Sequence, residues 1–274
     1  ISLTLIFRYG FEQAAQLINA GPAYHCATAL DLSRELAQRS QLDHVFVCNT
    51  GAEANEGAVK LARKWGQLQR AGAYEIITTE GSFHGRTLAM MAASGKPGFA
   101  QLYAPPIAGF RHVPFGDTAG VAAAIGAQTV AVMVEPIQGE AGVNVPPPGY
   151  LQELRKLTRE RGILLILDEI QTGIGRTGKL FACEHEDVLL DIMTLGKGLG
   201  GGFPLAALLA RRAVSCFVPG DQGGTYAGHP LGCAVGSAVL RALSAPGFLE
   251  HVARAAAHLS AGLTRLAAAY GGGP

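Results

Sequence analysis

A short apolar run, ILLIL at positions 163–167, ends directly at Asp168. Such a run is typical of a strand that is buried on both of its faces. Similar runs alternate along the chain with segments of helical periodicity. This alternation predicts an α/β fold, in which a doubly wound, mostly parallel sheet is flanked by helices. Ligands of such folds bind at the carboxyl ends of the strands, and Asp168 occupies one of these ends.

The hydrophobic pattern also predicts the individual elements. Buried strands are expected over 44–49, 74–80, 129–137, 163–167 and 205–211. Helices are expected over 29–40, 53–70, 149–162, 229–245 and 247–270, and a short one over FEQAAQLINAG that ends at Gly21.

Composition excludes several classes of protein. Hydrophobic residues make up 49% of the 274 positions and charged residues 16%, which predicts a large core. A net charge of +1 gives no reason to expect nucleic acid or an anionic membrane surface as a partner. No apolar run reaches the length of a membrane span. The five cysteines are scattered and odd in number, which favours reduced thiols in a cytoplasm over disulfides or a zinc site.

We expect the loops that follow the predicted strands to converge on one edge of the sheet. The first of these loops, Thr50-Gly51-Ala52, opens a long predicted helix. The free backbone N–H groups at a helix start form an anion site, which favours a phosphate at Gly51 and Ala52. The alternative is an ordinary strand-to-helix turn in which Thr50 is only the N-cap.

The second loop, GSFHGRT at 81–87, combines an aromatic ring with a guanidinium. Phe83 is suited to stack on a flat cofactor, and Arg86 to hold a carboxylate in a bidentate manner. A surface loop anchored by Phe83 is the alternative. A nucleophilic pair of Ser82 and His84 is disfavoured, because neighbouring positions rarely align for proton transfer and the sequence offers no third member.

Two further loops carry carboxylates. Glu135 and Glu140 bracket the turn EPIQGE, as acid–base groups or metal ligands, but further donors at suitable spacing are missing, so we predict no metal. Asp168 and Glu169 are adjacent, and neighbouring side chains of a strand point to opposite faces. Only one of them is therefore expected to reach a site, together with Gln171 in the following turn.

Lys197 follows a short apolar run and precedes the glycines of KGLGGG. A solvated surface lysine is the usual alternative, but a lysine in a glycine-lined pocket is suited to Schiff-base chemistry. The lysine precedes the glycines, whereas a nucleotide-binding P-loop has the order GxxxxGKS/T, so that reading is disfavoured. A carboxylate for a pyridinium nitrogen and a lysine for an aldehyde are the two groups that pyridoxal phosphate requires.

Taken together, these residues resemble the class III aminotransferases of the ornithine and acetylornithine type. The resemblance spans most of residues 20–245. It rests on CNTGAEANEGAVKLARKW (48–65), GSFHGRT (81–87), VEPIQGEAGV (134–143), LLILDEIQTGIGRTGKLFACEH (164–185), LGKGLGGGFPLAA (195–207) and GTYAGHPLGCAV (224–235).

The resemblance implies a pyridoxal 5'-phosphate site and a role for each matching residue. It implies Lys197 as the Schiff-base lysine and proton shuttle, Asp168 at the pyridinium nitrogen, Gln171 at the ring hydroxyl, Gly51 and Ala52 at the phosphate, Phe83 on the ring face, Arg86 at a substrate carboxylate, Glu135 in support, and Glu140 near the substrate pocket. Thr225 would reach the phosphate of a neighbouring subunit, which implies a homodimer with shared active sites.

The implied reaction moves an amino group from N-acetylornithine, or a related ω-amino acid, to 2-oxoglutarate in two half-reactions. Ornithine, 4-aminobutyrate or succinyl-diaminopimelate aminotransferases, an aminomutase, and a remnant that binds the cofactor without turnover are the alternatives. We expect a partial N-terminal segment (1–40), a cofactor-binding large domain (41–245), and a helix (246–274) that leads to a missing small domain. The chain is therefore expected to be truncated at both ends.

Overall fold

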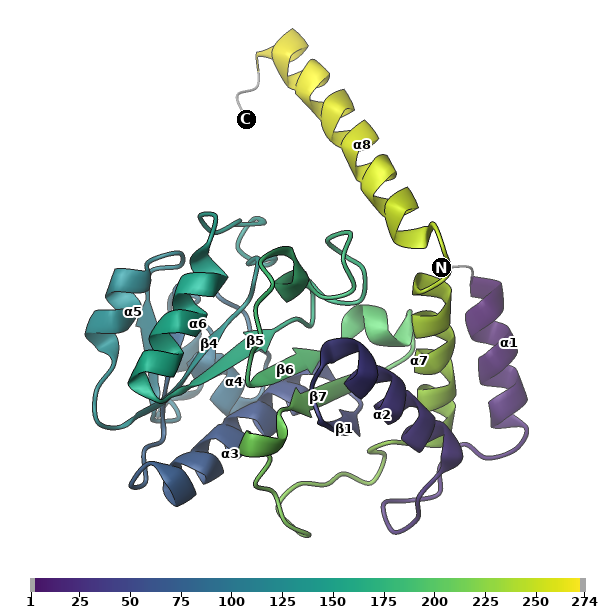
Figure 1. Cartoon of the computed structure of the whole chain (residues 1–274), viewed down its shortest axis with the longest axis horizontal. Coiled ribbons are helices and arrows are strands. Elements are labelled where there is room, and N and C mark those ends of the chain that lie inside the picture. Colours follow the sequence, from purple (N-terminus) through teal and green to yellow (C-terminus); the bar gives the residue numbers. More distant parts are fainter. Residues whose placement is uncertain (1–2, 272–274) are drawn as a thin grey trace.

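One seven-stranded sheet lies at the centre of the molecule in a computed structural model that describes residues 3–271 (Figure 1). The strands are β1 (His44–Cys48), β2 (Glu75–Thr79), β3 (Phe110–Val113), β4 (Thr129–Val134), β5 (Leu164–Asp168), β6 (Ile192–Leu195) and β7 (Ala206–Ala210). The α-helices are α1 (Leu3–Ala14), α2 (Ala27–Ser40), α3 (Gly51–Gln69), α4 (Leu88–Ala93), α5 (Thr118–Ala124), α6 (Tyr150–Arg161), α7 (Pro230–Leu243) and α8 (Phe248–Tyr270).

The strands follow the order β1-β7-β6-β5-β4-β2-β3. Pairs within the run from β6 to β3 are parallel, whereas β7 runs antiparallel to both β6 and β1. Because β1 and β6 are both antiparallel to β7, β1 points the same way as the parallel strands. The carboxyl ends of six strands therefore share one edge, which confirms the predicted mostly parallel sheet.

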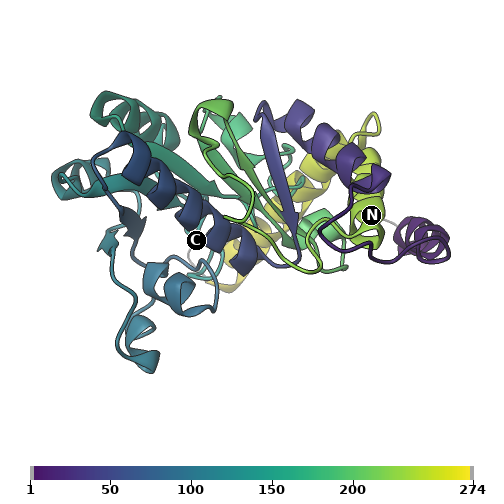
Figure 2. The same ribbon diagram turned by 90° about the horizontal axis from the view of Figure 1, so that it is seen from below.

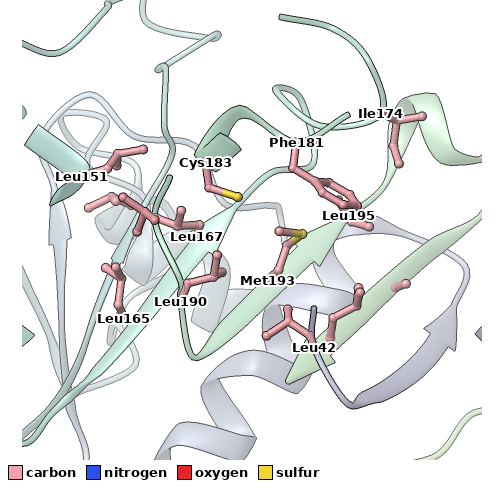
Figure 3. Close-up of a cluster of buried hydrophobic side chains, with 14 of the residues drawn as sticks. Leu42, Leu151, Leu165, Leu167, Ile174, Phe181, Cys183, Leu190, Met193 and Leu195 are labelled. Atoms are coloured by element: carbon pink, nitrogen blue, oxygen red, sulfur yellow. The ribbon is translucent and has the colours of Figure 1, made fainter. Parts of the chain in front are cut away.

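Alternate residues of the central strands build two separate cores. Leu165 and Leu167 of β5 pack with residues of α2, α5, α6 and α7 on one face, and Figure 3 shows them near Met193 and Leu195 of β6. Leu164 and Ile166 of β5 pack with residues of α3 and α4 on the other face. Figure 2 shows the same layers from below. The sheet is thus covered on both faces, as a parallel sheet requires.

Helix α8 extends away from the sheet, and none of its residues is buried (Figure 1). Within residues 3–271 no single helix is long and apolar enough to cross a membrane. The consecutive helices α7 and α8, which are bent by 71° relative to each other, together meet this requirement by length and composition alone. The domain boundaries proposed after residues 40 and 245 stay predictions.

The structure corrects several expected elements. The N-terminal helix is α1, which begins at Leu3 and ends at Ala14 instead of Gly21. It stops before a turn in which the side chain of Asn19 accepts the N–H of Gly21 (3.1 Å). Strand β1 lies at an edge of the sheet, and His44 at its start is exposed, so it is not buried throughout. Strands β3 and β6 and helices α4 and α5 were not predicted.

A buried ion cluster around Asp191 joins helix α6, strand β5 and the segment that follows β7. Asp191, which is 1% exposed, accepts the backbone N–H of Leu165 (2.8 Å) and an N–H of Arg155 (2.7 Å), and it pairs with Arg211. Burial works to lower the pKa of Arg155, while the Asp191 charge opposes it. The carboxylate therefore offsets part of the desolvation of a guanidinium from α6.

We predict that Asp191→Ala lowers the free energy of unfolding by about 3–5 kcal/mol, because it leaves a buried Arg155 without its partner. Asp31→Ala is the matched control, since Asp31 pairs with Arg34 on the surface of α2 at 2.8 Å, and its loss should cost less than about 1 kcal/mol. Urea unfolding of both variants measures the difference. Equal losses in the two variants would contradict the assignment of Asp191 as a framework residue.

Candidate functional site

A pocket of about 270 Å³ opens at the edge where the strands end. Its lining comes from the loops after β1, β2, β4, β5 and β6, so the predicted convergence of these loops is confirmed. The lining residues are Gly51, Ala52, Phe83, His84, Gly85, Arg86, Glu135, Asp168, Ile170, Gln171 and Lys197.

The start of α3 forms one wall of this pocket. Thr50 is the N-cap, and it forms a capping box in which its side chain accepts the N–H of Glu53 (3.2 Å) while Glu53 accepts the N–H of Thr50 (2.8 Å). The box uses the amides of Thr50 and Glu53, and Gly51 and Ala52 between them line the pocket. The predicted N-cap is therefore confirmed, and the two residues that follow it face the pocket, while a phosphate at their amides stays a prediction.

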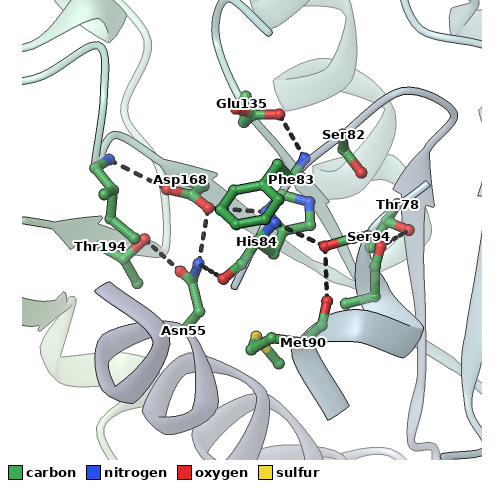
Figure 4. A network of polar contacts seen from close by, with 12 residues as sticks. Asn55, Thr78, Ser82, Phe83, His84, Met90, Ser94, Glu135, Asp168 and Thr194 are labelled. Carbon is green, nitrogen blue, oxygen red and sulfur yellow. Dashed lines mark hydrogen bonds and ion pairs between the residues drawn. The ribbon is translucent and has the colours of Figure 1, made fainter. Parts of the chain in front are cut away.

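Asp168 is the best-connected group of the site (Figure 4). One carboxylate oxygen, Oδ2, accepts Nδ2–H of Asn55 and faces Nδ1 of His84, both at 2.8 Å. The other oxygen, Oδ1, accepts the backbone N–H of Ile170 at 3.1 Å. Asn55 is itself oriented by Thr194, whose hydroxyl donates to Asn55 Oδ1 (2.7 Å). The carboxylate is thus fixed by residues from α3, from the β2 loop and from its own turn.

Glu169 points the other way, as the alternation of a strand predicts. Its side chain is fully buried and accepts the N–H groups of Ala182 and Cys183 (both 2.8 Å) and the hydroxyl of Thr172 (2.8 Å). Burial raises the pKa of Glu169, and these donors work against that rise. Its role is to hold the loop after β5, while Asp168 alone of the two reaches the pocket.

Two titratable side chains beside Asp168 have shifted pKa values. Burial disfavours a charged His84, but the hydrogen bond and charge of Asp168 and the charge of Glu135 outweigh it, so the pKa of His84 is raised. Burial is also the main reason that the pKa of Glu135 rises to about 7, although His84 opposes it. Glu135 accepts the backbone N–H of Phe83 at 3.1 Å, which ties the β4 loop to the β2 loop.

Lys197 lies in a tight bend with φ of 40°, but its side chain is 48% exposed, so it is less enclosed than the glycine-rich sequence suggested. The exposure follows from its position, because Lys197 and Gln171 line both the first pocket and a second one of about 610 Å³. Nζ of Lys197 lies 4.0 Å from Glu140 Oε1. The lysine therefore stands at the boundary between two open spaces.

Phe83 and Arg86 lie together at the mouth of the first pocket. The guanidinium of Arg86 is 5.8 Å from the ring centres of both Phe83 and Phe99, a distance at which cation–π attraction operates. The described side chains offer Arg86 no ion pair within 4.0 Å, so its donors are available to a ligand. This arrangement suits an anionic group above the pocket.

Two predicted site residues lie apart from this lining. Glu140 contacts Lys197 and Lys96 from outside the first pocket. Thr225 lies in an exposed loop before α7, where its carbonyl accepts Nδ2–H of Asn19 (3.3 Å). The structure therefore brings the other predicted residues together around the first pocket and leaves Glu140 and Thr225 outside its lining.

Sequence reasoning missed Asn55 and Thr194, and it considered His84 only as part of a nucleophilic pair. A signal for Asn55 was present, because it is a polar residue on the stripe of α3 that includes Gly51, Ala58 and Ala62. Thr194 gave a weaker signal, as a threonine inside an apolar strand. Their importance follows from the fold, since Asp168 and Thr194 both face α3.

The chain is similar to known aminotransferases. It matches the family described as Aminotransferase class-III over residues 11–272. The acetylornithine aminotransferase 2 of Bordetella parapertussis is 55% identical over 260 residues, which are 95% of this chain and 66% of that protein. This chain therefore spans just under two thirds of the length of such curated relatives.

Solved structures agree with the fold. An ornithine aminotransferase of Toxoplasma gondii, described with partial occupancy of PLP at its active site, superposes with a TM-score of 0.91 at 35% identity, covering 95% of this chain and 63% of that one. The N-acetylornithine aminotransferase of Stenotrophomonas maltophilia gives 0.82 at 38% identity, covering 98% and 66%. The predicted fold class is confirmed by these superpositions.

We predict that the free energy of unfolding of the wild type falls relative to that of Glu135→Gln as the pH rises from about 4.5 to about 7. In this window the folded carboxyl keeps its proton while the unfolded one has lost it. The folded state then binds more protons, so its free energy of unfolding falls with pH, by about 1.4 kcal/mol per unit. Urea unfolding across this pH range measures the difference. The exposed control Glu250→Gln should keep the wild-type profile, and a Glu135→Gln profile parallel to the wild type would contradict the prediction.

Proposed function

This chain belongs to the class III aminotransferases, and we propose that it transfers an amino group from N-acetylornithine, or a related ω-amino acid, to 2-oxoglutarate. The observation that carries the proposal is the convergence of Asp168, Lys197 and the Gly51–Ala52 helix start on one pocket. The names of its relatives favour N-acetylornithine as the donor. Ornithine is the nearest competitor, because an ornithine aminotransferase also superposes closely.

Class III aminotransferases use pyridoxal phosphate, and the residues of the pocket fit this group. A Cβ on Gly51 would come within 2.8 Å of Ile170 Cδ1, so the start of α3 approaches the β5 turn as closely as glycine permits. Oε1 of Gln171 is buried and has no hydrogen-bond partner among the described residues. When bound, pyridoxal phosphate supplies an aldehyde that exchanges amines and a ring that accepts an electron pair.

We assign the cofactor contacts from this geometry. The amides of Gly51 and Ala52 would hold the phosphate at the positive end of α3. Asp168 would pair with the ring nitrogen, and the unpartnered Oε1 of Gln171 would accept the ring hydroxyl. Phe83 would cover one face of the ring. Asp168 and the capped start of α3 are already held in place before the ligand arrives.

The position of Lys197 suits a proton carrier. Its amine borders the cofactor pocket on one side and the second pocket on the other, where an amino donor has room. Nζ would take the proton from the amino-bearing carbon of the substrate and return it on the cofactor side. Glu140, at 4.0 Å, is a counter-charge for the lysine in its protonated state.

Arg86 would bind a carboxylate of the substrate, and Glu135 would support the site by anchoring the amide of Phe83. We further propose a homodimer with shared active sites, in which Thr225, exposed and outside the pocket of its own chain, contacts the phosphate held by the other subunit. The free cysteines of the described chain support a cytoplasmic location. The division into 1–40, 41–245 and 246–274 is proposed on the same family grounds.

We predict a yellow absorbance band when the purified chain is incubated with pyridoxal phosphate and passed over a gel filtration column. The band should be absent from Lys197→Ala, because the amine that captures the aldehyde is gone, and present in Lys179→Ala, which removes an exposed lysine. N-acetylornithine should then bleach the band more efficiently than ornithine. A wild type without a band would contradict the cofactor site, and a band without turnover would favour the remnant that only binds the cofactor.

We predict that Arg86→Lys lowers kcat/KM for 2-oxoglutarate roughly 10- to 100-fold, because a lysine keeps the charge but loses the bidentate hydrogen bonds. Cofactor absorbance should stay unchanged. Arg176→Lys is the comparison, since Arg176 lines the second pocket. A larger loss in Arg176→Lys than in Arg86→Lys would move the carboxylate site to the second pocket.

A further inference from the structure

We infer that His84 is a positioning residue, whose Nδ1–H bond to Asp168 Oδ2 turns the other carboxylate oxygen toward the ring nitrogen of the cofactor. This inference rests on the proposed function, because it needs pyridoxal phosphate in the pocket. It goes beyond that function, because it assigns the orientation of Asp168 to His84, a side chain for which no role was predicted.

The two oxygens of Asp168 are not equivalent. Oδ2 receives Asn55 and His84, both at 2.8 Å, and a carboxylate oxygen has two lone-pair directions, so Oδ2 is saturated. Oδ1 receives only the amide of Ile170, at 3.1 Å. One acceptor direction remains on Oδ1, and it is the one left for a cationic N–H in the pocket.

The backbone of His84 is anchored on both sides, and its side chain is buried (Figure 4). Its side chain is 0% exposed, its backbone N–H donates to Ser94 Oγ (2.9 Å), and its carbonyl accepts Asn55 Nδ2–H (2.7 Å). Because a carboxylate only accepts, Nδ1 carries the hydrogen toward Asp168. Such a preorganised donor fixes a carboxylate without paying orientation entropy when the ligand binds.

Only one nitrogen of the ring is used in this way. Nε2 of His84 is buried and has no hydrogen-bond partner among the described residues. Asp168 and Glu135 are the two carboxylates whose charges act on the ring, and they favour a charge-assisted bond at Nδ1. The chemical requirement at position 84 is therefore a donor at the place of Nδ1. An asparagine amide can supply that donor, whereas a glutamine amide reaches the place of Nε2.

The competing interpretation is that His84 only anchors the 81–87 loop. Ser94→Ala is a matched control for this role, because it removes the acceptor of the His84 backbone N–H and leaves the bond between His84 and Asp168 intact. A loop anchor affects every ligand of the pocket equally. A residue that acts through Asp168 affects only ligands that carry the ring nitrogen.

The experiment compares pyridoxal phosphate with its deaza analogue, in which carbon replaces the ring nitrogen. Dissociation constants of both ligands are measured by absorbance titration of the cofactor-free wild type, His84→Asn, His84→Gln and Ser94→Ala. The wild type should prefer pyridoxal phosphate. In His84→Gln, the ratio of the two dissociation constants that expresses this preference should fall about tenfold, which is the effect of one charge-assisted hydrogen bond. His84→Asn and Ser94→Ala should retain the preference, even if Ser94→Ala binds both ligands more weakly.

The outcomes separate the two proposals. A wild type that binds neither ligand overturns the proposed function and this inference with it. A wild type that binds both ligands equally, a His84→Gln preference equal to that of the wild type, or a His84→Asn preference as low as that of His84→Gln overturns the inference alone. If His84→Gln does not fold, the Nδ1–H proton signal of His84 in the wild type, assigned by its absence from His84→Asn, gives the answer. The chemical shift of this proton should change when pyridoxal phosphate binds and should not change when the analogue binds. Equal changes with the two ligands overturn the inference.

Discussion

Asp168 is 3% exposed at the end of a central strand, and most of the site follows from the need to supply its carboxylate with hydrogen-bond donors. A charge removed from water is tolerated only where hydrogen-bond donors replace the solvent. The donors here come from Asn55 in α3, from His84 after β2 and from the backbone of Ile170. One buried group therefore fixes a helix, a loop and a turn relative to one another, and these same three segments line the pocket.

Because successive side chains of a strand point to opposite faces, the neighbouring carboxylates Asp168 and Glu169 have different partners. Asp168 faces α3, where Thr194 of the adjacent strand orients Asn55. Glu169 faces the other way and binds backbone amides of the segment that follows β5. The loop that carries Gln171 is thus anchored by one acid while the other remains available to a ligand. A single residue added to β5 would exchange these two roles.

Sequence patterns predicted what depends on local periodicity. The buried strand before Asp168, the helix after Thr50 and the glycine bend at Lys197 are visible because each lies at a change of pattern. The contribution of Asn55 was hidden, because a polar residue inside a helix shows its role only once the facing strand is known. Strand β3 was hidden for a similar reason, since FRHV becomes a strand by pairing with β2. The exposure of Lys197 depends on the space around it, which periodicity does not encode.

Strand β1 hydrogen-bonds within the sheet only to β7, which lies some 160 positions later in the chain. Helix α3, which begins at Gly51, packs against β6 and β7, so the wall of the pocket beside Lys197 is complete once β7 has been added. Closing so long a loop is slow compared with local pairing. During synthesis, the turn at Gly51 and Asp168 are both made before β7. A ligand that bridges the turn and Lys197 favours chains in which β1 and β7 have paired, and so it reports on the completion of the sheet.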